Sequence, residues 1–197
     1  MGAPLAQAAT YLIQTLVSLY LIVVMLRFLL QLVRADFYNP ISQFVVRATD
    51  ALVRPLRKVI PGFGGLDLAS LLLALLIQAL AFAVILILAG FPVLNPIALL
   101  GWSLVALLSL TLDIFFFALL IVIVLSWVAP NSYNPAALLL RQLTEPVMEP
   151  VRRVIPPLGG LDLSPIVVFI LINLIDMLVV RQLAVTLHMP RGLALGL

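Results

Sequence analysis

The feature that most constrains this chain is a stretch of 45 residues without a charged side chain, which lies between Asp67 and Asp113. A helix needs roughly 20 residues to cross the apolar core of a bilayer, so this stretch is too long for one span and fits two. Gly90-Phe91-Pro92 and Asn95-Pro96 provide the break between them. The sequence therefore predicts two membrane helices joined by a short turn.

The composition extends this prediction to the whole chain. Hydrophobic residues make up 64% and charged residues 10%, against roughly 45–50% and roughly 25% in soluble domains. The apolar residues form continuous runs, as in 71–77, which excludes the alternating pattern of a membrane β-barrel. We predict an all-α membrane protein whose four transmembrane helices cover about 10–33, 68–91, 105–128 and 163–186.

An internal repeat becomes visible when residue n is aligned with residue n + 95. Between positions 38 and 68 the two copies align without a gap, and 14 of the 31 positions are identical. The matched positions include Asn, Pro, Gly and Asp, which a shared apolar composition does not explain. We predict tandem repeats over 1–95 and 96–197, each with two spans. Both copies then insert in the same direction, which makes them parallel rather than inverted repeats.

Each repeat begins its inter-span segment with the same helix-start signal. Asn39 and Asn134 suit an N-cap, and Pro40 and Pro135 suit the first helical position. An amphipathic helix of about a dozen residues should follow, too short to cross the membrane and therefore placed in its interface. We expect Pro55 and Pro150 to end these helices. Their apolar positions are Ile41, Phe44, Val45, Ala48 and Leu52 in one copy and Ala136, Leu139, Leu140, Leu143 and Val147 in the other.

Basic residues then predict the orientation. Arg57-Lys58 precedes Pro61, and Arg152-Arg153 precedes Pro156; both pairs are expected to reach anionic headgroup phosphates. The turn between the second and third spans carries no basic residue, whereas both long loops do. The positive-inside rule therefore places both loops in the cytoplasm and both termini outside.

The return to the membrane has its own pattern. Gly64-Gly65 and Gly159-Gly160 allow a sharp turn with positive φ. Asp67 and Asp162 follow and suit the N-cap of the returning helix, where they accept backbone N–H bonds that lipid cannot accept. Each carboxylate can also pair with an arginine, Arg57 or Arg152, from the same repeat or from the other one. The alternative is an exposed aspartate in a solvated loop.

This combined pattern resembles that of a known family. The order Asn-Pro, then Pro-x-Arg-Arg/Lys-x-Ile-Pro, then Gly-Gly-Leu-Asp-Leu-Ser-Pro, in two copies among four apolar segments, is similar to the YggT (YlmG) family of bacterial and plastid membrane proteins. The second copy matches through Ser164-Pro165, whereas the first has Ala69-Ser70 there. The resemblance implies a small multi-pass inner-membrane protein linked to osmotic or ion stress, to division-site or nucleoid organisation, or to haem attachment in plastids. It implies no catalytic residue.

Little in the sequence points to catalysis. The chain has no cysteine, and its one histidine, His188, cannot build a zinc site that needs three or four ligands. We expect His188 to be a capping or exposed residue. No glycine-rich phosphate loop with its lysine is present. We therefore expect no enzymatic activity, metal or cofactor. The basic residues lie beside apolar segments, so anionic headgroups are favoured over nucleic acid as their partner.

The polar residues inside the predicted spans are the remaining candidates for a function, because burying them is costly. Arg27 and Arg181 lie toward span ends, where they can snorkel to the surface. Asp113 and Asp176 lie at similar depths and predict either a buried structural contact or a polar path. Gln78 and Asn173 are equivalent under the repeat, which favours interhelical hydrogen bonds over conduction.

Two functions fit these features. One is a membrane scaffold or assembly factor that contacts anionic lipid and forms a homo-oligomer or binds another membrane protein. The other is a channel or transporter subunit that uses Asp113 and Asp176. Spans built mostly from Leu, Ile, Val and Ala leave little polar lining for a pore, so the sequence favours the scaffold.

Overall fold

A computed structural model describes residues 3–60, 62–92, 95–129, 133–156, 162–190 and 193, and the regular structure of this part is helical. Four of its helices are long and apolar enough to cross a membrane. They are α1 (Ala3–Leu32), α3 (Leu68–Leu88), α4 (Pro96–Val128) and the continuous last span formed by α6 (Ser164–Ile175), η1 (Asp176–Val180) and α7 (Arg181–Thr186). The all-α class and the four apolar helices are thereby confirmed.

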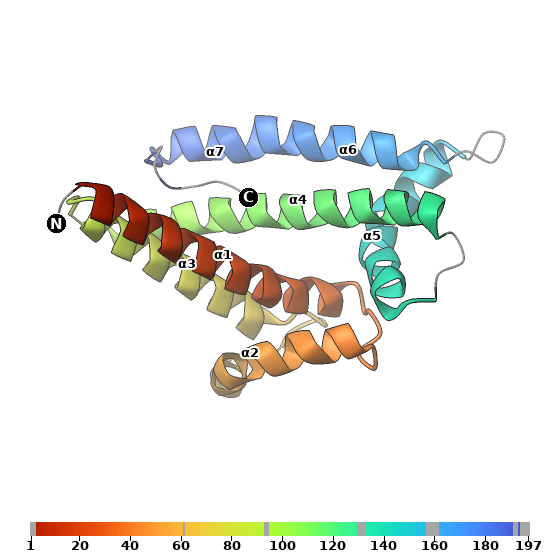
Figure 1. The fold of residues 1–197 in the computed structure, drawn as a ribbon, viewed down its shortest axis with the longest axis horizontal. Helices are drawn as coiled ribbons and strands as arrows, with labels where there is room; N and C mark the ends of the chain where they lie inside the picture. The colour runs from red at the N-terminus through yellow and green to blue at the C-terminus, as the bar shows by residue number, and fades with distance from the viewer. Residues whose placement is uncertain are drawn as a thin grey trace.

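Two further helices connect the spans at the same end of the bundle. Figure 1 shows α2 (Pro40–Val59), which connects α1 to α3 and lies below them in this view, and α5 (Pro135–Val154), which connects α4 to α6 and runs across the spans. The two connections contact each other: the Asn39 Nδ2 donates to the Pro135 carbonyl at 2.7 Å, and the Gln142 Oε1 accepts from the Asp36 N–H at 3.0 Å.

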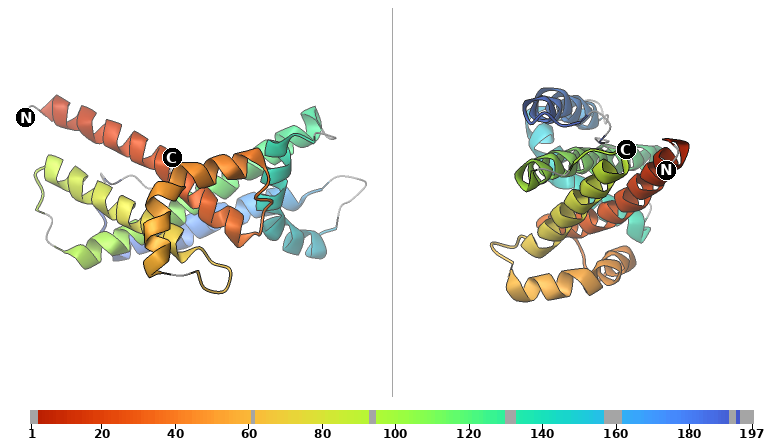
Figure 2. Two further views of the ribbon diagram at one scale, coloured as in Figure 1. Left: turned by 90° about the horizontal axis from the view of Figure 1, so that it is seen from below. Right: turned by 90° about the vertical axis from the view of Figure 1, so that its left-hand side faces the viewer.

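The main core lies among α1, α3 and α4. Fully buried Leu21 and Met25 of α1 pack with Leu73 of α3 and Leu110 of α4. The last span lies beside α4 (Figures 1 and 2) and buries few of its own side chains. Ile166, Ile170 and Leu178 are among its many exposed apolar residues, as expected for a helix that faces lipid.

The third span begins nine residues before its predicted start at 105. The Asn95 Oδ1 accepts from the Ile97 and Ala98 N–H groups, and Pro96 occupies the first helical position. The residues expected to form only a turn therefore also start the helix. The Trp102 Nε1 donates to the Leu187 carbonyl at 2.8 Å, which ties these added turns to the end of the last span.

Pro55 and Pro150 do not end the inter-span helices, and that prediction was wrong. α2 continues to Val59 and α5 to Val154. A proline inside a helix removes one backbone hydrogen bond and can kink the helix without stopping it. The left view of Figure 2 shows a sharp bend in α2. The two basic pairs consequently lie in last helical turns, where a cation interacts favourably with the helix dipole.

Candidate functional site

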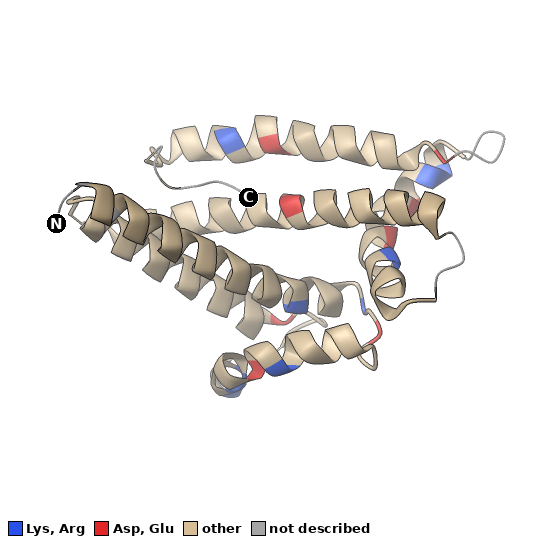
Figure 3. Ribbon diagram, viewed as in Figure 1, with Lys and Arg blue, Asp and Glu red and all other residues tan. Residues whose placement is uncertain are grey.

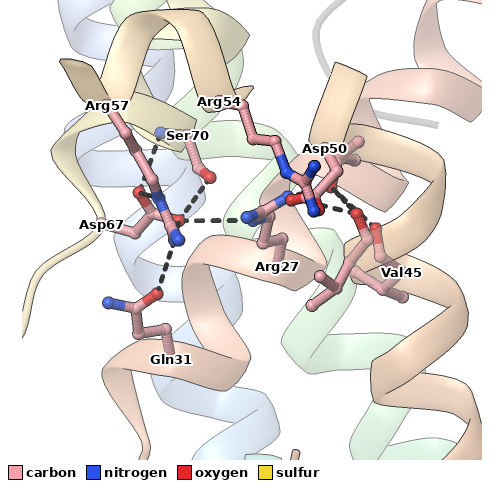
Figure 4. Close-up of polar contacts among 10 residues, drawn as sticks. Arg27, Gln31, Val45, Asp50, Arg54, Arg57, Asp67 and Ser70 are labelled. Atoms are coloured by element: carbon pink, nitrogen blue, oxygen red, sulfur yellow. Dashed lines mark hydrogen bonds and ion pairs between the residues drawn. The ribbon is translucent and has the colours of Figure 1, made fainter. Parts of the chain in front are cut away.

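Charged residues concentrate at the end of the bundle that carries α2 and α5 (Figure 3). Seven residues between positions 27 and 70 form one connected network of ion pairs and hydrogen bonds, shown in Figure 4. We call this network the Arg27 cluster; its members are Arg27, Gln31, Asp50, Arg54, Arg57, Asp67 and Ser70.

Arg27 is the centre of the cluster and is only 2% exposed. Its Nη1 lies 3.0 Å from the Asp50 Oδ1 and donates to the Thr49 Oγ1 at 2.7 Å and to the Val46 carbonyl at 3.2 Å. Its Nε lies 3.4 Å from the Asp67 Oδ2. One side chain thus joins α1, α2 and the start of α3.

The prediction that Arg27 snorkels to the membrane surface was wrong. α2 folds across the end of α1 and brings Asp50 to the guanidinium (Figure 4), so the charge is neutralised inside the protein. A buried arginine of this kind is tolerated only because carboxylates and hydrogen-bond acceptors surround it.

Asp67 is the N-cap residue of α3, as the sequence predicts. Its carboxylate accepts from the Ser70 N–H at 3.3 Å and the Ser70 hydroxyl at 2.6 Å, and from the Arg57 Nε at 3.3 Å and Nη2 at 2.5 Å. Burial alone would raise the pKa of Asp67, but the hydrogen bonds from Arg57 and Ser70 outweigh burial and hold that pKa below its ordinary value. The carboxylate therefore remains charged at neutral pH.

The edge of the cluster reaches the turn before α3. The Gln31 Oε1 accepts from Arg57 at 3.1 Å, and its Nε2 donates to the Gly65 carbonyl at 3.4 Å. Gly64 and Gly65 have positive φ angles of 62° and 86°, as expected for this turn, and Pro61 lies outside the described residues.

The arginines of the two basic pairs, which are predicted to contact lipid phosphates, also form ion pairs within the protein. Arg57 is engaged by Asp67, Arg152 by Asp162 and Glu145, and Arg153 by Glu149. A carboxylate four to ten residues away in the chain reaches each guanidinium within the protein. Lys58 is exposed and forms no ion pair within the described part of the chain.

Residues 134–164 carry a related but more open network. The Arg152 Nε donates to the Asp162 Oδ2 at 2.9 Å, and its Nη1 donates to the Glu145 Oε1 at 2.6 Å. These three side chains are 32–50% exposed, compared with 2% for the Asp67 side chain. The loop residue Pro156 is described, whereas Gly159 and Gly160 lie outside the described residues.

Asp162 differs from its predicted role by one position. The N-cap residue of α6 is Leu163, and Asp162, just before it, accepts from the Ser164 N–H at 2.9 Å. Burial would raise the pKa of Asp162, but hydrogen bonds from Ser164 and Arg152 lower it below the ordinary value. Burial lowers the pKa of Arg152, but Asp162 and Glu145 reverse this and raise it.

The helix starts of α2 and α5 match in detail. The Asn39 Oδ1 accepts from the Ile41 N–H at 2.9 Å, and the Asn134 Oδ1 accepts from the Ala136 N–H at 2.9 Å. Pro40 and Pro135 occupy the first helical positions. Both Asn-Pro pairs therefore do what the sequence predicts.

Alignment at n + 95 explains how the two networks differ. It pairs Asp50 with Glu145, but it places Val122 opposite Arg27. Without a central arginine, Arg152 itself bridges the two carboxylates. Sequence reasoning missed Asp50 and Glu145. The repeat contains a signal for them: Thr49-Asp50 aligns with Thr144-Glu145, so that an acidic residue follows a threonine in both copies.

Three intramembrane polar residues, Asn173, Asp176 and Arg181, form hydrogen bonds within the last span. The Arg181 Nε donates to the Asp176 Oδ2 at 2.9 Å, across the π-helical turn of η1. The Asn173 Nδ2 donates to the Phe169 carbonyl of its own helix at 2.8 Å. The charges of Asp176 and Arg181 therefore neutralise each other within the last span.

A small cavity of about 40 Å³ lies between α1, α3 and α4. Gln14, Ser18 and Gln78 supply its polar lining, and its size suits water. Neither Asp113, on α4, nor Asp176 lines it.

His188 lies just after the C-terminal end of α7, where it is exposed and has a φ of 51°. The described residues contain no group of three or more potential metal ligands.

Comparison with known proteins places this geometry in a family. The CCB3/YggT family model matches residues 6–88 and, again, residues 101–183. The chain belongs to the CCB3/YggT family. The second CCB3/YggT match begins 95 residues after the first, the same offset that aligns Asp67 with Asp162. The Arg27 cluster and the Arg152 network each lie within one match.

Several CCB3/YggT relatives align along most of the chain. A Pseudomonas aeruginosa protein, uncharacterized protein PA0392, is 58% identical over 191 residues, which are 96% of this chain and 97% of that protein. A Vibrio alginolyticus protein encoded in the proC 3' region is 44% identical over 82% of this chain and 87% of its own length. YggT of Escherichia coli K12 is 38% identical over 91% and 93%, respectively. No solved structure matches the chain.

Proposed function

We propose that this protein is a non-enzymatic scaffold of the inner membrane, which holds two short helices at the cytoplasmic interface and supports assembly of the envelope under osmotic stress. The observation that carries this proposal is the buried Arg27 cluster. Its charges bind one another and fix α2 against α1 and α3. The charged residues of the Arg27 cluster therefore hold α2 in place rather than bind a substrate.

The two faces of α2 support its interfacial position. Ser42, Val45, Thr49 and Val53 are buried against the protein. Ile41, Phe44, Ala48 and Leu52, at helical spacing on another face, are exposed. An exposed apolar stripe on a helix that lies across the ends of membrane spans is suited to the headgroup and acyl boundary. Val45, expected on this stripe, packs inward instead.

α5 differs from α2 because the apolar side chains at its predicted stripe positions are buried or partly buried. Leu139, Leu143 and Met148 are buried, and Leu140 and Val147 are partly buried. Together with the direct contact between Asn39 and Pro135, this supports a tandem arrangement in which residues 1–95 and 96–197 form one cytoplasmic platform. The platform is the part that we propose to bind a second copy or another membrane protein.

The proposed orientation puts this platform beside anionic lipid. Arg34, Arg47, Lys58 and Arg54 are exposed at this end, and the connection between α3 and α4 at the other end carries no basic residue. By the positive-inside rule, the platform then faces the cytoplasm.

The alternative function, ion movement along Asp113 and Asp176, has weaker support. Asp176 is bonded to Arg181, and the polar cavity of Gln14, Ser18 and Gln78 does not include either aspartate. We therefore use these two residues as the controls that separate the two functions.

The test is complementation of a strain that lacks this gene, grown after an osmotic upshift, combined with ion flux into liposomes that contain the purified protein. The scaffold predicts that Arg27→Val fails to restore growth, that Asp113→Asn and Asp176→Asn restore it, and that wild-type liposomes are no leakier than empty ones. A wild-type ion flux that Asp113→Asn abolishes would establish the alternative.

A further inference from the structure

We propose that the first repeat contains a specific site for the phosphate of an anionic glycerophospholipid, formed by Arg34 and the backbone of Gly64 and Gly65. The site is a surface pocket of about 470 Å³ between the end of α1 and the turn before α3. Gln31, Leu32, Arg34, Phe37, Gly64 and Gly65 line it. The inference rests on the membrane placement proposed above, in which these helix ends lie at headgroup level.

Arg34 occupies a backbone position that disfavours arginine. Its φ is 54°, and its N–H donates to the Gln31 carbonyl while the Ala35 N–H donates to the Leu30 carbonyl. These two bonds form a Schellman motif, whose left-handed position usually holds glycine. Gly90 fills the same position at the end of α3. His188 occupies the same position after α7. A non-glycine residue in this sparsely populated region supports a hypothesis of function only together with further observations.

The guanidinium of Arg34 is also available to a ligand. It is exposed and makes no ion pair or side-chain hydrogen bond with any described residue. This distinguishes it from Arg27, Arg54 and Arg57, which carboxylates engage. An unpaired arginine fork at the membrane surface matches a phosphate in geometry and in charge.

The glycine turn supplies the second half of the site. Gly64 and Gly65 both have positive φ, and space beyond each Cα is open. Their N–H groups donate to no acceptor among the described residues. Consecutive free N–H groups in such a turn form a concave anion-binding surface. Gln31 fixes the turn by donating to the Gly65 carbonyl.

The pocket has apolar walls as well, which selects a lipid over a free anion. Leu32 and Phe37 line it and are 46% and 40% exposed. Acyl chains of a bound lipid can pack on both residues while its phosphate contacts Arg34. Under the 95-residue offset, Arg34 corresponds to Ala129, so the second repeat lacks the arginine and the site belongs to the first repeat alone.

The test titrates the purified full-length protein in neutral detergent with phosphatidylglycerol, phosphatidylcholine or inorganic phosphate, and follows the melting midpoint. Phosphatidylglycerol should raise the midpoint more than phosphatidylcholine does. Arg34→Gly should reduce the apparent affinity for phosphatidylglycerol about five- to tenfold, the expected effect of losing one basic contact to an anionic headgroup. Without lipid, the same variant should melt at a higher temperature, because glycine relieves the strain.

Two matched variants complete the design. Arg34→Lys keeps the charge and should retain most of the lipid effect, and Arg47→Gln removes one exposed charge outside the pocket and should retain all of it. An equal loss in Arg34→Gly and Arg47→Gln would overturn the site in favour of diffuse attraction. A full shift with inorganic phosphate alone would overturn the lipid assignment. Since the purified protein is used, these results are independent of the growth assay that tests the scaffold.

Discussion

Arg27 places a positive charge inside the last turns of a membrane span, and carboxylates from two other elements neutralise it. Asp50 comes from α2 and Asp67 from the start of α3. Removing one partner of a buried ion pair costs about 3–5 kcal/mol, because the remaining charge loses its compensation. A half-exposed pair such as Arg152 with Glu145 is worth far less, since water screens it.

Asp67 and Asp162, which lie at the starts of α3 and α6, should respond differently to the loss of charge. Asp67→Asn keeps a capping oxygen but removes the charge that faces Arg27 and Arg57, so we expect it to destabilise the protein by about 3 kcal/mol, nearly as much as Asp67→Ala. Asp162→Ala should cost about 1 kcal/mol and Asp162→Asn less, because the side-chain oxygen of Asn can also accept from the Ser164 N–H. Thermal unfolding of these four variants in detergent measures the loss of stability at each of the two positions. A harmless Asp67→Asn would show that the cap alone matters.

The lowered pKa of Asp67 predicts a loss of stability in acid. A carboxyl whose folded-state pKa lies below its ordinary value of 3.8 contributes stability above that pH, and the contribution disappears as the pH falls through the folded-state pKa. The melting midpoint should therefore fall between about pH 5 and about pH 2. Asp67→Asn lacks this carboxyl and should show a shallower fall. An identical pH profile for the variant and the wild type would contradict the ion pairing of Asp67.

At the scale of elements, the sequence predicted what depends on local chemistry. Hydropathy located the spans, and Asn39-Pro40 with Gly64-Gly65 located the start of α2 and the turn before α3. The continuation of α2 through Pro55 was missed, because tertiary packing keeps a kinked helix together against its local preference. The partner of Arg27 was also missed, since Asp50 reaches it only through the direction in which α2 folds back.

The two faces of α2 give a test of its place in the interface. The chain has no cysteine, so Ala48→Cys on the exposed apolar face creates a single labelling site. In liposomes this cysteine should react slowly with a water-soluble maleimide, and Phe44→Asp should accelerate the reaction by drawing the face out of the lipid. Arg47→Asp, a charge change away from that stripe, is the control. Equal rates in all three proteins would place this face in water or against protein.

At the scale of the molecule, the two repeats share their helices and helix caps but differ in how deeply their charged networks are buried. The first has a buried central arginine, and the second has Val122 at that position and an open network. Sequence comparison at n + 95 gives the shared positions. It does not give the asymmetry in burial, which depends on how α2 and α5 pack against each other and on their own spans.

The positive-inside rule predicts the orientation of the whole chain from its basic loops. A reporter fused after Leu197 should be active outside the cytoplasm, and one inserted next to Lys58 should be active inside it. A pair of reporters that are active on opposite sides of the membrane, such as alkaline phosphatase and a fluorescent protein, distinguishes the two outcomes. A cytoplasmic C-terminus in a chain with four intact spans would contradict the proposed orientation.

The central claim is that the Arg27 cluster fixes α2 to the membrane spans. The most direct measurement is the distance distribution between spin labels on Ala48→Cys and Leu16→Cys in liposomes, because both positions are exposed and lie on α2 and α1. We predict a narrow distribution in the wild-type background and in Arg54→Gln, which loses only a largely exposed pair, and a broad one in Arg27→Val. A narrow, unchanged distribution in Arg27→Val would contradict the claim.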